Sequence, residues 1–382
     1  MDLQKEIEDI YPHVVALRRH LHQYPETGME TFQTAGYAAA ELERLGIPYR
    51  MVDDVGIIAE IKGKSEGKTV MLRADLDALH VEEKTGLPFA SRNEGKMHAC
   101  GHDMHTAMLL GTAAILKKHQ DTFAGTVRLL FQPGEEISRG AVALIKAGAL
   151  DNVSYGFGLH MDPLAPAHRI SSCIGPDWAA VDHFRIVVKG KGAHGATPQK
   201  GHDALVAACA IVNALQTMVS RESDPMQPLV VTVGKFHAGT SYNIIAEEAE
   251  LEGTCRSFDE ALHERIPGML ERIAKGVAEA YGCEAELFFT NHSRPLVNDA
   301  RAYEILHHAA LKVVPEENWH VRQPEMIGED FSEYASRIPC VFAHLGGDAG
   351  YALHSCHIQF REETMKTGMA LEVQFALDAL DC

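Results

Sequence analysis

A nine-residue stretch, Met97 to His105, concentrates side chains that can bind a metal ion. It holds one thiol, three imidazoles and one carboxylate, a density that no packing or turn requirement explains. Cys100 and His102 flank Gly101, and because glycine has no Cβ the backbone can bend so that both point at one ion. Such a cluster indicates a metal or catalytic site, the alternative being a polar loop with an incidental buried cysteine.

Further groups able to bind a metal follow the predicted strands. Short apolar runs predict strands at residues 69–72, 126–131, 155–159 and 339–345. Acidic or histidine residues come after these runs: Asp75, Glu135, Glu136, His160 and, beyond a glycine-rich loop, His354. In open α/β sheets the carboxyl ends of strands carry the functional site, so we expect one site built from these ends.

The donor set predicts which metals would bind and how many. Imidazole, thiolate and carboxylate together favour Zn²⁺, Mn²⁺, Ni²⁺ or Co²⁺ over Ca²⁺ and Mg²⁺, which prefer oxygen ligands. A single catalytic zinc needs only three protein ligands, whereas two metals roughly 3.5–4 Å apart could share a bridging group and polarise a carbonyl. Glu135 and Glu136 point different ways in an extended segment, so one can ligate while the other acts as general base.

Other readings of these residues remain open. Taken alone, the two glutamates fit a solvated turn, and His160 or His354 fits a hydrogen-bonded structural histidine. Cys100 could be a nucleophile of the papain type, but the carboxylate pair would then be unexplained. No nucleophile elbow, dinucleotide fingerprint or P-loop motif is present, which weakens serine-hydrolase, dehydrogenase and NTPase functions.

Composition narrows the class of protein. The 382 residues include 35 basic and 53 acidic side chains, and the net charge of −18 opposes binding to nucleic acid or an anionic membrane. We find no apolar run long enough for a membrane span and no apolar signal peptide at the N-terminus. The eight cysteines form no C-x-x-C pair, which favours reduced thiols and a cytoplasmic location.

The order of predicted elements indicates an α/β protein of two domains. Residues 1–181 and 295–382 alternate helices and strands, and predict a catalytic domain with a mixed central sheet flanked by helices. Residues 182–294 predict the order β-α-β-β-α-β of a ferredoxin-like α+β domain inserted into the first. The expected helix after the cysteine-histidine stretch spans 106–120.

Six motifs in collinear order resemble those of the dinuclear-metal aminoacylase and carboxypeptidase superfamily. The match is greatest to the amidohydrolase branch of hippurate hydrolases and indole-acetyl-amino-acid hydrolases, and it covers almost the whole chain. The motifs are Arg73-Ala-Asp-Leu-Asp-Ala-Leu79, His98-Ala-Cys-Gly-His-Asp-Met-His105, Phe131-Gln-Pro-Gly-Glu-Glu136, Gly158-Leu-His160, Gly192-Ala-His-Gly195 and Gly328-Glu-Asp-Phe331.

The resemblance implies roles for the candidate residues of the catalytic domain. Glu135 would be general base and acid, and Asp75 would orient a ligand. Other branches carry a histidine where Arg73 stands here. The two metals would be held by Cys100, His102, Glu136, His160 and His354. His357 follows closely and could compete with His354, whose flanking residues fit the pattern better.

The resemblance also implies that the inserted domain closes over the site as a lid and mediates a homodimer, possibly a homotetramer. His194 would stabilise the oxyanion, in some relatives across the dimer. Asn243 and Arg256 would bind the substrate's carboxylate, which suits the forked guanidinium. A turn for Asn243 and an ion pair for Arg256 are the structural alternatives.

Together these features predict a metal-dependent amidohydrolase. It would cleave the amide bond of small N-acyl amino acids, with a metal-bridging hydroxide as nucleophile and Glu135 moving the proton. A metallo-dipeptidase or carboxypeptidase is the alternative within the superfamily. A non-catalytic metal-binding or ligand-binding protein is the alternative of another class. The acyl group, the amino acid and the native metal are not specified by these residues.

Overall fold

The computed structural model describes residues 1–382 as two compact units. The first unit comprises Met1–Asp177, Val297–Gln323 and Asp330–Cys382, so the chain leaves it and returns to it twice. The second comprises Trp178–Leu296 and Pro324–Glu329, and it includes the range 182–294 that the sequence predicts as an inserted domain. The two units are described separately below.

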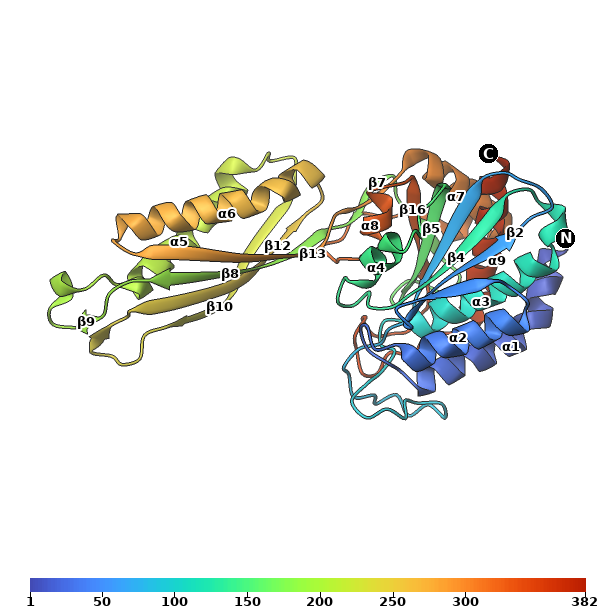
Figure 1. The fold of residues 1–382 in the computed structure, drawn as a ribbon, viewed down its shortest axis with the longest axis horizontal. Coiled ribbons are helices and arrows are strands. Elements are labelled where there is room, and N and C mark those ends of the chain that lie inside the picture. Colours follow the sequence, from blue (N-terminus) through green and yellow to red (C-terminus); the bar gives the residue numbers. More distant parts are fainter. The chain divides into compact units, whose positions relative to one another are not determined.

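An eight-stranded mixed sheet forms the centre of the first unit (Figure 1). Strands β3, β4, β5 and β16 run parallel, whereas β2 is antiparallel to β4 and β6 is antiparallel to β16. In sheet order the strands are β1 (Tyr49–Val52), β2 (Gly56–Lys62), β4 (Thr126–Gln132), β3 (Thr69–Asp75), β5 (Val153–Asp162), β16 (Cys340–Gly346), β6 (Ile170–Ser172) and β15 (Trp319–Val321). The predicted α/β class with a mixed central sheet is confirmed.

Helices cover both faces of this sheet. One face is covered by α1 (Leu3–Gln23), α2 (Phe32–Arg44), α3 (His102–Lys118), α7 (Ala300–Val313) and α9 (Met365–Asp381), and the other by α4 (Gly140–Lys146) and α8 (Ser332–Ala335). The predicted start of α3 at residue 106 is wrong by four residues. Gly101, with φ +97°, turns the chain directly into the helix. The negative charge of Asp103 in the first turn interacts favourably with the positive end of the helix dipole.

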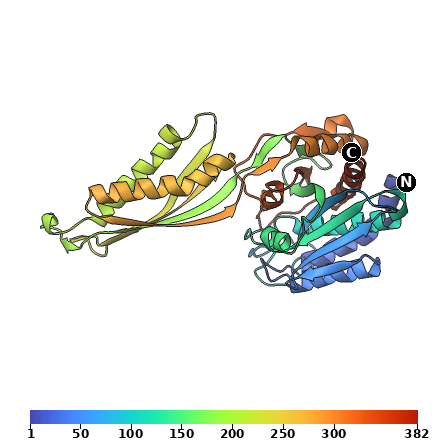
Figure 2. The same ribbon diagram turned by 45° about the horizontal axis from the view of Figure 1, so that its top comes forward.

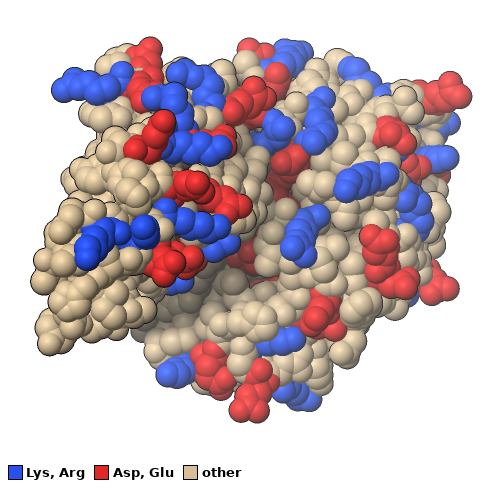
Figure 3. All heavy atoms as spheres, turned by 60° about the vertical axis from the view of Figure 1, so that its left-hand side comes forward, with Lys and Arg blue, Asp and Glu red and all other residues tan.

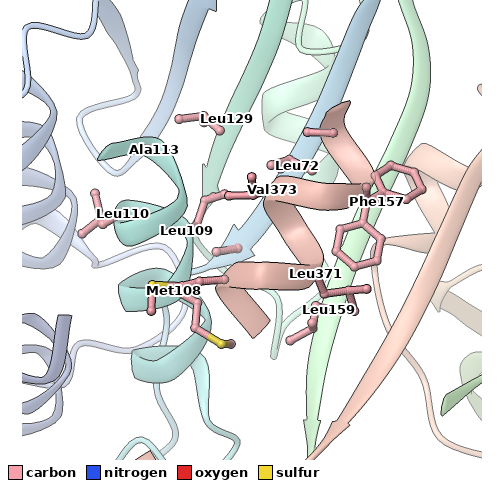
Figure 4. Close-up of a cluster of buried hydrophobic side chains, with 14 of the residues drawn as sticks. Leu72, Met108, Leu109, Leu110, Ala113, Leu129, Phe157, Leu159, Leu371 and Val373 are labelled. Atoms are coloured by element: carbon pink, nitrogen blue, oxygen red, sulfur yellow. The ribbon is translucent and has the colours of Figure 1, made fainter. Parts of the chain in front are cut away.

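The core of the first unit lies between α3, α9 and the central strands (Figure 4). Leu109 of α3 and Val373 of α9 meet Leu72 of β3, and all three are buried. The rings of Phe157 and Phe375 stack with centroids 4.7 Å apart. Since α1 covers the outer side of α3, nearly every residue of α3 is buried, and its first turn is held rigidly at the edge of the sheet.

One buried acid in this core gives a testable pH dependence. Glu372 accepts a hydrogen bond of 2.5 Å from the Thr112 hydroxyl, and burial raises its pKa from the ordinary 4.5 to about 8. Between these two values the unfolded chain releases this proton while the folded chain keeps it, so stability falls as pH rises. We expect Glu372→Gln to remove this loss, which is on the order of a few kcal/mol.

Thermal melts of wild type and Glu372→Gln between pH 5 and pH 8 would measure the effect. The melting temperature of the variant relative to wild type should increase with pH across this window. A difference that does not change with pH would show that Glu372 ionises normally in the folded state.

The second unit is a four-stranded antiparallel sheet with two helices on one face (Figure 2). The sheet order is β10 (Leu229–Ala238), β12 (Glu248–Ser257), β8 (Ala180–Lys189) and β13 (Glu284–Ser293), and the helices are α5 (Ala204–Thr217) and α6 (Glu260–Ala280). A short pair, β9 (Ala193–His194) and β11 (Ile244–Ile245), extends one end. Strands β7 (Gly175–Trp178) and β14 (Leu296–Asn298) lie where the chain passes between the units.

One helical stretch, Ala204–Glu222, is long and apolar enough to cross a membrane by length and composition alone, which corrects the expectation from the sequence that no apolar run has this length. Its inner face carries Ala207, Ile211 and Leu215 into the core of the second unit, so it is a packed element of this fold. Basic and acidic side chains are interspersed on the face shown in Figure 3, in agreement with the absence of a basic block in the sequence.

Candidate metal centre and active site

The strand ends of the first unit meet as the sequence predicts. Because β3, β4 and β5 are parallel neighbours, their carboxyl ends lie at one edge of the sheet. Asp75 ends β3, the loop with Glu135 and Glu136 follows β4, and His160 lies near the end of β5. Cys100 and the first turn of α3 reach the same edge, since Cys100 Sγ lies 3.4 Å from His160 Nε2.

Two histidines are held in the orientation that metal binding requires. The Nδ1 of His102 lies 2.8 Å from the backbone oxygen of Asp77, and the Nδ1 of His160 lies 2.8 Å from that of Met161. Since a carbonyl only accepts, each ring donates from Nδ1, and in its neutral form it has the lone pair of Nε2 available for a metal. The Nε2 of His102 is buried and has no hydrogen-bond partner, as expected of a ligand atom.

Two groups of ligand atoms share the Cys100 thiol. Cys100 lies with His102 and His160 in one group, and with Glu136 and His354 in another. The His354 Nε2 is 3.5 Å from Cys100 Sγ and 3.7 Å from a Glu136 oxygen. The other Glu136 oxygen is buried without a hydrogen-bond partner and lies 3.9 Å from His102 Nε2. Two overlapping groups joined by one thiol fit a pair of ions with a shared ligand.

The electrostatics of the pocket also fit cations. Burial raises the pKa of Cys100, and the nearby Glu136, Glu135 and Asp75 raise it further. Although burial opposes a charge on His102, the carboxylates around it raise its pKa to about 10. Burial likewise raises the pKa of Glu136 to about 7. Buried acids with too few neutralising partners are the setting in which a divalent cation binds and holds a thiolate ionised.

The backbone at His354 is strained. Its φ is +66°, in the left-handed region that residues other than glycine rarely occupy. Its N–H donates to the oxygen of Ala99, which ties the strained residue to the cysteine-histidine stretch. His357 is exposed instead, and its Nδ1 lies 3.1 Å from the Lys84 oxygen. The structure thus brings His354, rather than His357, to Cys100 and Glu136.

Asp75 is fully buried behind these ligands. Arg73 Nη1 donates to one carboxylate oxygen at 2.6 Å, and His105 Nδ1 donates to the other at 2.6 Å. His105 Nε2 in turn accepts the Met161 N–H at 2.9 Å. One carboxylate oxygen of Asp75 lies 3.7 Å from His102 Nε2. Burial opposes the charge on Asp75, but His102, His105 and Arg73 beside it hold its pKa well below the ordinary value. This position agrees with an orienting role.

Several buried partners of the site were missed by sequence reasoning. Arg73 also contacts Gln132 and Asp330, at 3.0 and 2.9 Å, and Tyr334 donates to Gln132. The long distances along the chain concealed these contacts, although Arg73 and Asp330 stand in two of the quoted motifs. His105 and Asp77 stand in two of the quoted motifs, and the sequence indicates His105 as a candidate to support a ligand and Asp77 as a candidate carboxylate after a strand, without naming the groups they contact.

The candidate residues of the second unit do not all come together. His194 pairs with Ile244, and the Gly195 N–H donates to the Asn243 oxygen at 2.8 Å, so His194 and Asn243 are neighbours. Arg256 lies on β12 opposite Val181 at the start of β8, whereas β9 follows the far end of β8. Its guanidinium donates to the Cys255 oxygen at 2.8 Å and to Thr254.

Comparison with known proteins identifies the family. The model of peptidase family M20/M25/M40 matches residues 71–378. N-acetyl-L-cysteine deacetylase of Bacillus subtilis is 40% identical over 89% of this chain and 82% of its own. Thermostable carboxypeptidase 1 of Saccharolobus solfataricus is 35% identical over 96% of this chain and 95% of its own.

A solved structure shares the fold. It is a dinuclear metal-binding peptidase of the M20 family from Bacillus subtilis, 34% identical with a TM-score of 0.86, and the match covers 98% of this chain and 99% of that one. The predicted superfamily and the predicted class of amide-bond hydrolase are confirmed at the level of the family. This chain belongs to peptidase family M20/M25/M40.

Proposed function

We propose that this protein is a metal-dependent amidohydrolase that releases amino acids from small N-acyl amino acids. The observation that carries the proposal is the placement of Glu135, which lies in one group with His102 and Glu136 beside the two groups that share Cys100. A carboxylate next to a set of metal ligands is the arrangement that water activation needs. The similarity to a deacetylase of an N-acetyl amino acid supports this substrate class.

We infer that two divalent ions, of Mn, Zn, Ni or Co, bind at this site. Their ligands would be Cys100, His102, Glu136, His160 and His354. When bound, such a pair polarises a substrate carbonyl and lowers the pKa of water. The mixed sulfur, nitrogen and oxygen donors do not select among these four metals. The similarity to a dinuclear metal-binding peptidase supports the number of ions.

In this proposal Glu135 moves the proton. Its carboxylate takes the proton from the attacking water and later gives it to the nitrogen of the leaving amino acid. Asp75 orients the ligands from behind, fixed by Arg73 and His105. The hydrogen bonds to Asp75 keep this carboxylate from turning away from His102.

We further infer that the protein works as a homodimer. His194 would stabilise the oxyanion, while Asn243 and Arg256 would bind the substrate carboxylate. Arg256 pairs with Val181 at one end of β8, a ten-residue strand of roughly 30 Å, whereas His194 lies on β9, which follows the other end of β8. One copy of the second unit therefore cannot present His194 and Arg256 to one small substrate, which favours His194 and its neighbour Asn243 acting from the other copy. A monomeric mass by light scattering would contradict this inference.

One of the two alternatives keeps specific support. A dipeptidase or carboxypeptidase would use the same metal centre, and the similarity to a thermostable carboxypeptidase favours testing it. A non-catalytic binding protein, by contrast, would not need Glu135 beside the ligands.

We also infer a cytoplasmic location. The eight cysteines are unpaired, which supports a reducing compartment.

A substrate screen tests the proposal. Metal-free protein would be supplied with each of the four metals and incubated with N-acetyl and N-benzoyl amino acids, dipeptides and longer peptides, with products identified by mass spectrometry. We expect free amino acid from at least one N-acyl amino acid, with higher kcat/KM than any dipeptide. Cleavage of peptides alone would favour the carboxypeptidase alternative, and an inert metal-loaded protein would contradict both.

A further inference from the structure

Arg256 has one edge of its guanidinium available for a ligand. Its Nη1 donates to the Cys255 oxygen at 2.8 Å and to the Thr254 hydroxyl, which uses both hydrogens of this nitrogen. The opposite edge, formed by Nε and Nη2, has no hydrogen-bond partner, and the half-buried side chain forms no ion pair. A cation removed from water without a counter-ion is costly, and this free edge has the fork that binds a carboxylate with two hydrogen bonds.

Two histidines share the face of the sheet on which Arg256 lies. Because side chains alternate along a strand, His183 and Arg256 point away from the helices, opposite to their buried neighbours Phe184 and Cys255. The ring centroid of His183 lies 6.5 Å from that of His292 on β13. This end of the open face therefore carries a guanidinium and two imidazoles.

A β-bulge places His292 in this group. The register of β13 against β8 shifts between Asn291 and Ser293, so His292 is the extra residue of the bulge. Such bulges re-aim a side chain and are frequent beside active sites. His292 is exposed, and its ring nitrogens have no hydrogen-bond partner. The bulge thus leaves this imidazole available for a ligand.

The surroundings of His292 favour an anion. Burial lowers the pKa of His292, and the positive charges of His183 and Arg256 lower it further. Asp182 raises this pKa, but its carboxylate is buried and lies 3.0 Å from His263 Nε2. A bound carboxylate would relieve the repulsion between these positive groups.

One carboxylate on the same face is already neutralised. Glu252 Oε2 lies 3.6 Å from His183 Nε2, and Glu252 also accepts a hydrogen bond from Lys235. Since Lys235 balances the charge of Glu252, the charge of Arg256 remains without a counter-ion.

We propose that Arg256, His183 and His292 form a subsite for an amino acid with a second carboxylate in its side chain, so that the substrates are N-acyl dicarboxylic amino acids. This proposal rests on the proposed function. The free edge of Arg256 would bind the α-carboxylate, and the two imidazoles would donate to the side-chain carboxylate. Strands β12 and β13 lie two strand spacings apart, roughly 10 Å, which favours glutamate over the shorter aspartate.

Two substrates of matched shape test this proposal. N-acetyl-L-glutamate and N-acetyl-L-glutamine differ only in the charge of the side chain. We expect the metal-loaded wild type to have a kcat/KM about tenfold or more higher for the glutamate compound, as one hydrogen bond to a charged group provides. His292→Ala and His183→Ala should lose most of this preference and keep the kcat/KM for N-acetyl-L-glutamine. His308→Ala, at an exposed histidine of α7 in the first unit, should keep the preference.

Equal kcat/KM for the two compounds in wild type would overturn the proposal, as would an unchanged preference in both His292→Ala and His183→Ala. If wild-type protein hydrolyses nothing in the substrate screen, the proposed function fails, and binding then decides whether the subsite exists. Calorimetry on metal-free protein should show about tenfold or more tighter binding of N-acetyl-L-glutamate than of N-acetyl-L-glutamine. Equal dissociation constants for the two compounds would contradict the subsite.

Discussion

Glu135→Gln should lose nearly all turnover while still binding its metals. Glutamine has the shape of glutamate but cannot take a proton, and general acid–base catalysis contributes about 10²–10⁴-fold to rate. The backbone N–H of residue 135 would still bond to Asp77, so the loop should keep its place. The measurement is kcat on the substrate found in the screen, together with metal content per chain.

The control for this variant is Glu372→Gln, which makes the same chemical change at a buried glutamate bonded only to Thr112. It should keep wild-type kcat. Retained activity in Glu135→Gln would refute the assignment of the proton carrier. Loss of activity accompanied by loss of metal would instead move Glu135 into the ligand set.

Cys100→Ser should lower metal affinity more than any other single change at the site. Its sulfur lies 3.4 Å from His160 Nε2 and 3.5 Å from His354 Nε2, and it belongs to both groups of ligand atoms. A serine hydroxyl stays protonated and is a poor ligand for these metals, so both ions lose a ligand. We expect a loss greater than the roughly 10–100-fold caused by removing a residue that merely supports a ligand.

Chelator competition on purified protein measures this affinity without relying on activity. Cys173→Ser is the matched control, because Cys173 is also buried in the first unit and donates only to the Pro176 oxygen, which a hydroxyl can also do. Equal metal affinity in Cys100→Ser and Cys173→Ser would exclude Cys100 as a shared ligand.

Most of the candidate metal centre could be predicted because each proposed ligand follows a local pattern. Glu136 and His160 come at the ends of apolar strands, and the rule that parallel strand ends share an edge brings them together. Cys100 and His102 are joined by a glycine whose positive φ the sequence already permits. His354 was chosen over His357 by its flanking residues, and the structure places it with Cys100 and Glu136.

The partners behind the ligands could not be predicted in the same way. Asp330 reaches Arg73 and Gln132 across about two hundred residues or more of chain, and nothing in the spacing of these residues indicates that they meet. The Asp77 carboxylate accepts the backbone N–H groups of Glu135 and Glu136, and such contacts leave no trace in residue types. Helix α3 began earlier than its apolar pattern because Gly101 starts it and polar residues fill its first turn.

The most direct test of the central claim is a titration of metal-free protein with Mn²⁺ while amino acid release from an N-acyl amino acid is followed. Two ions held by ligands that share Cys100 predict no turnover without metal and a plateau at two equivalents per chain. Turnover in the absence of metal, or no release of amino acid at any amount of metal, would contradict this account.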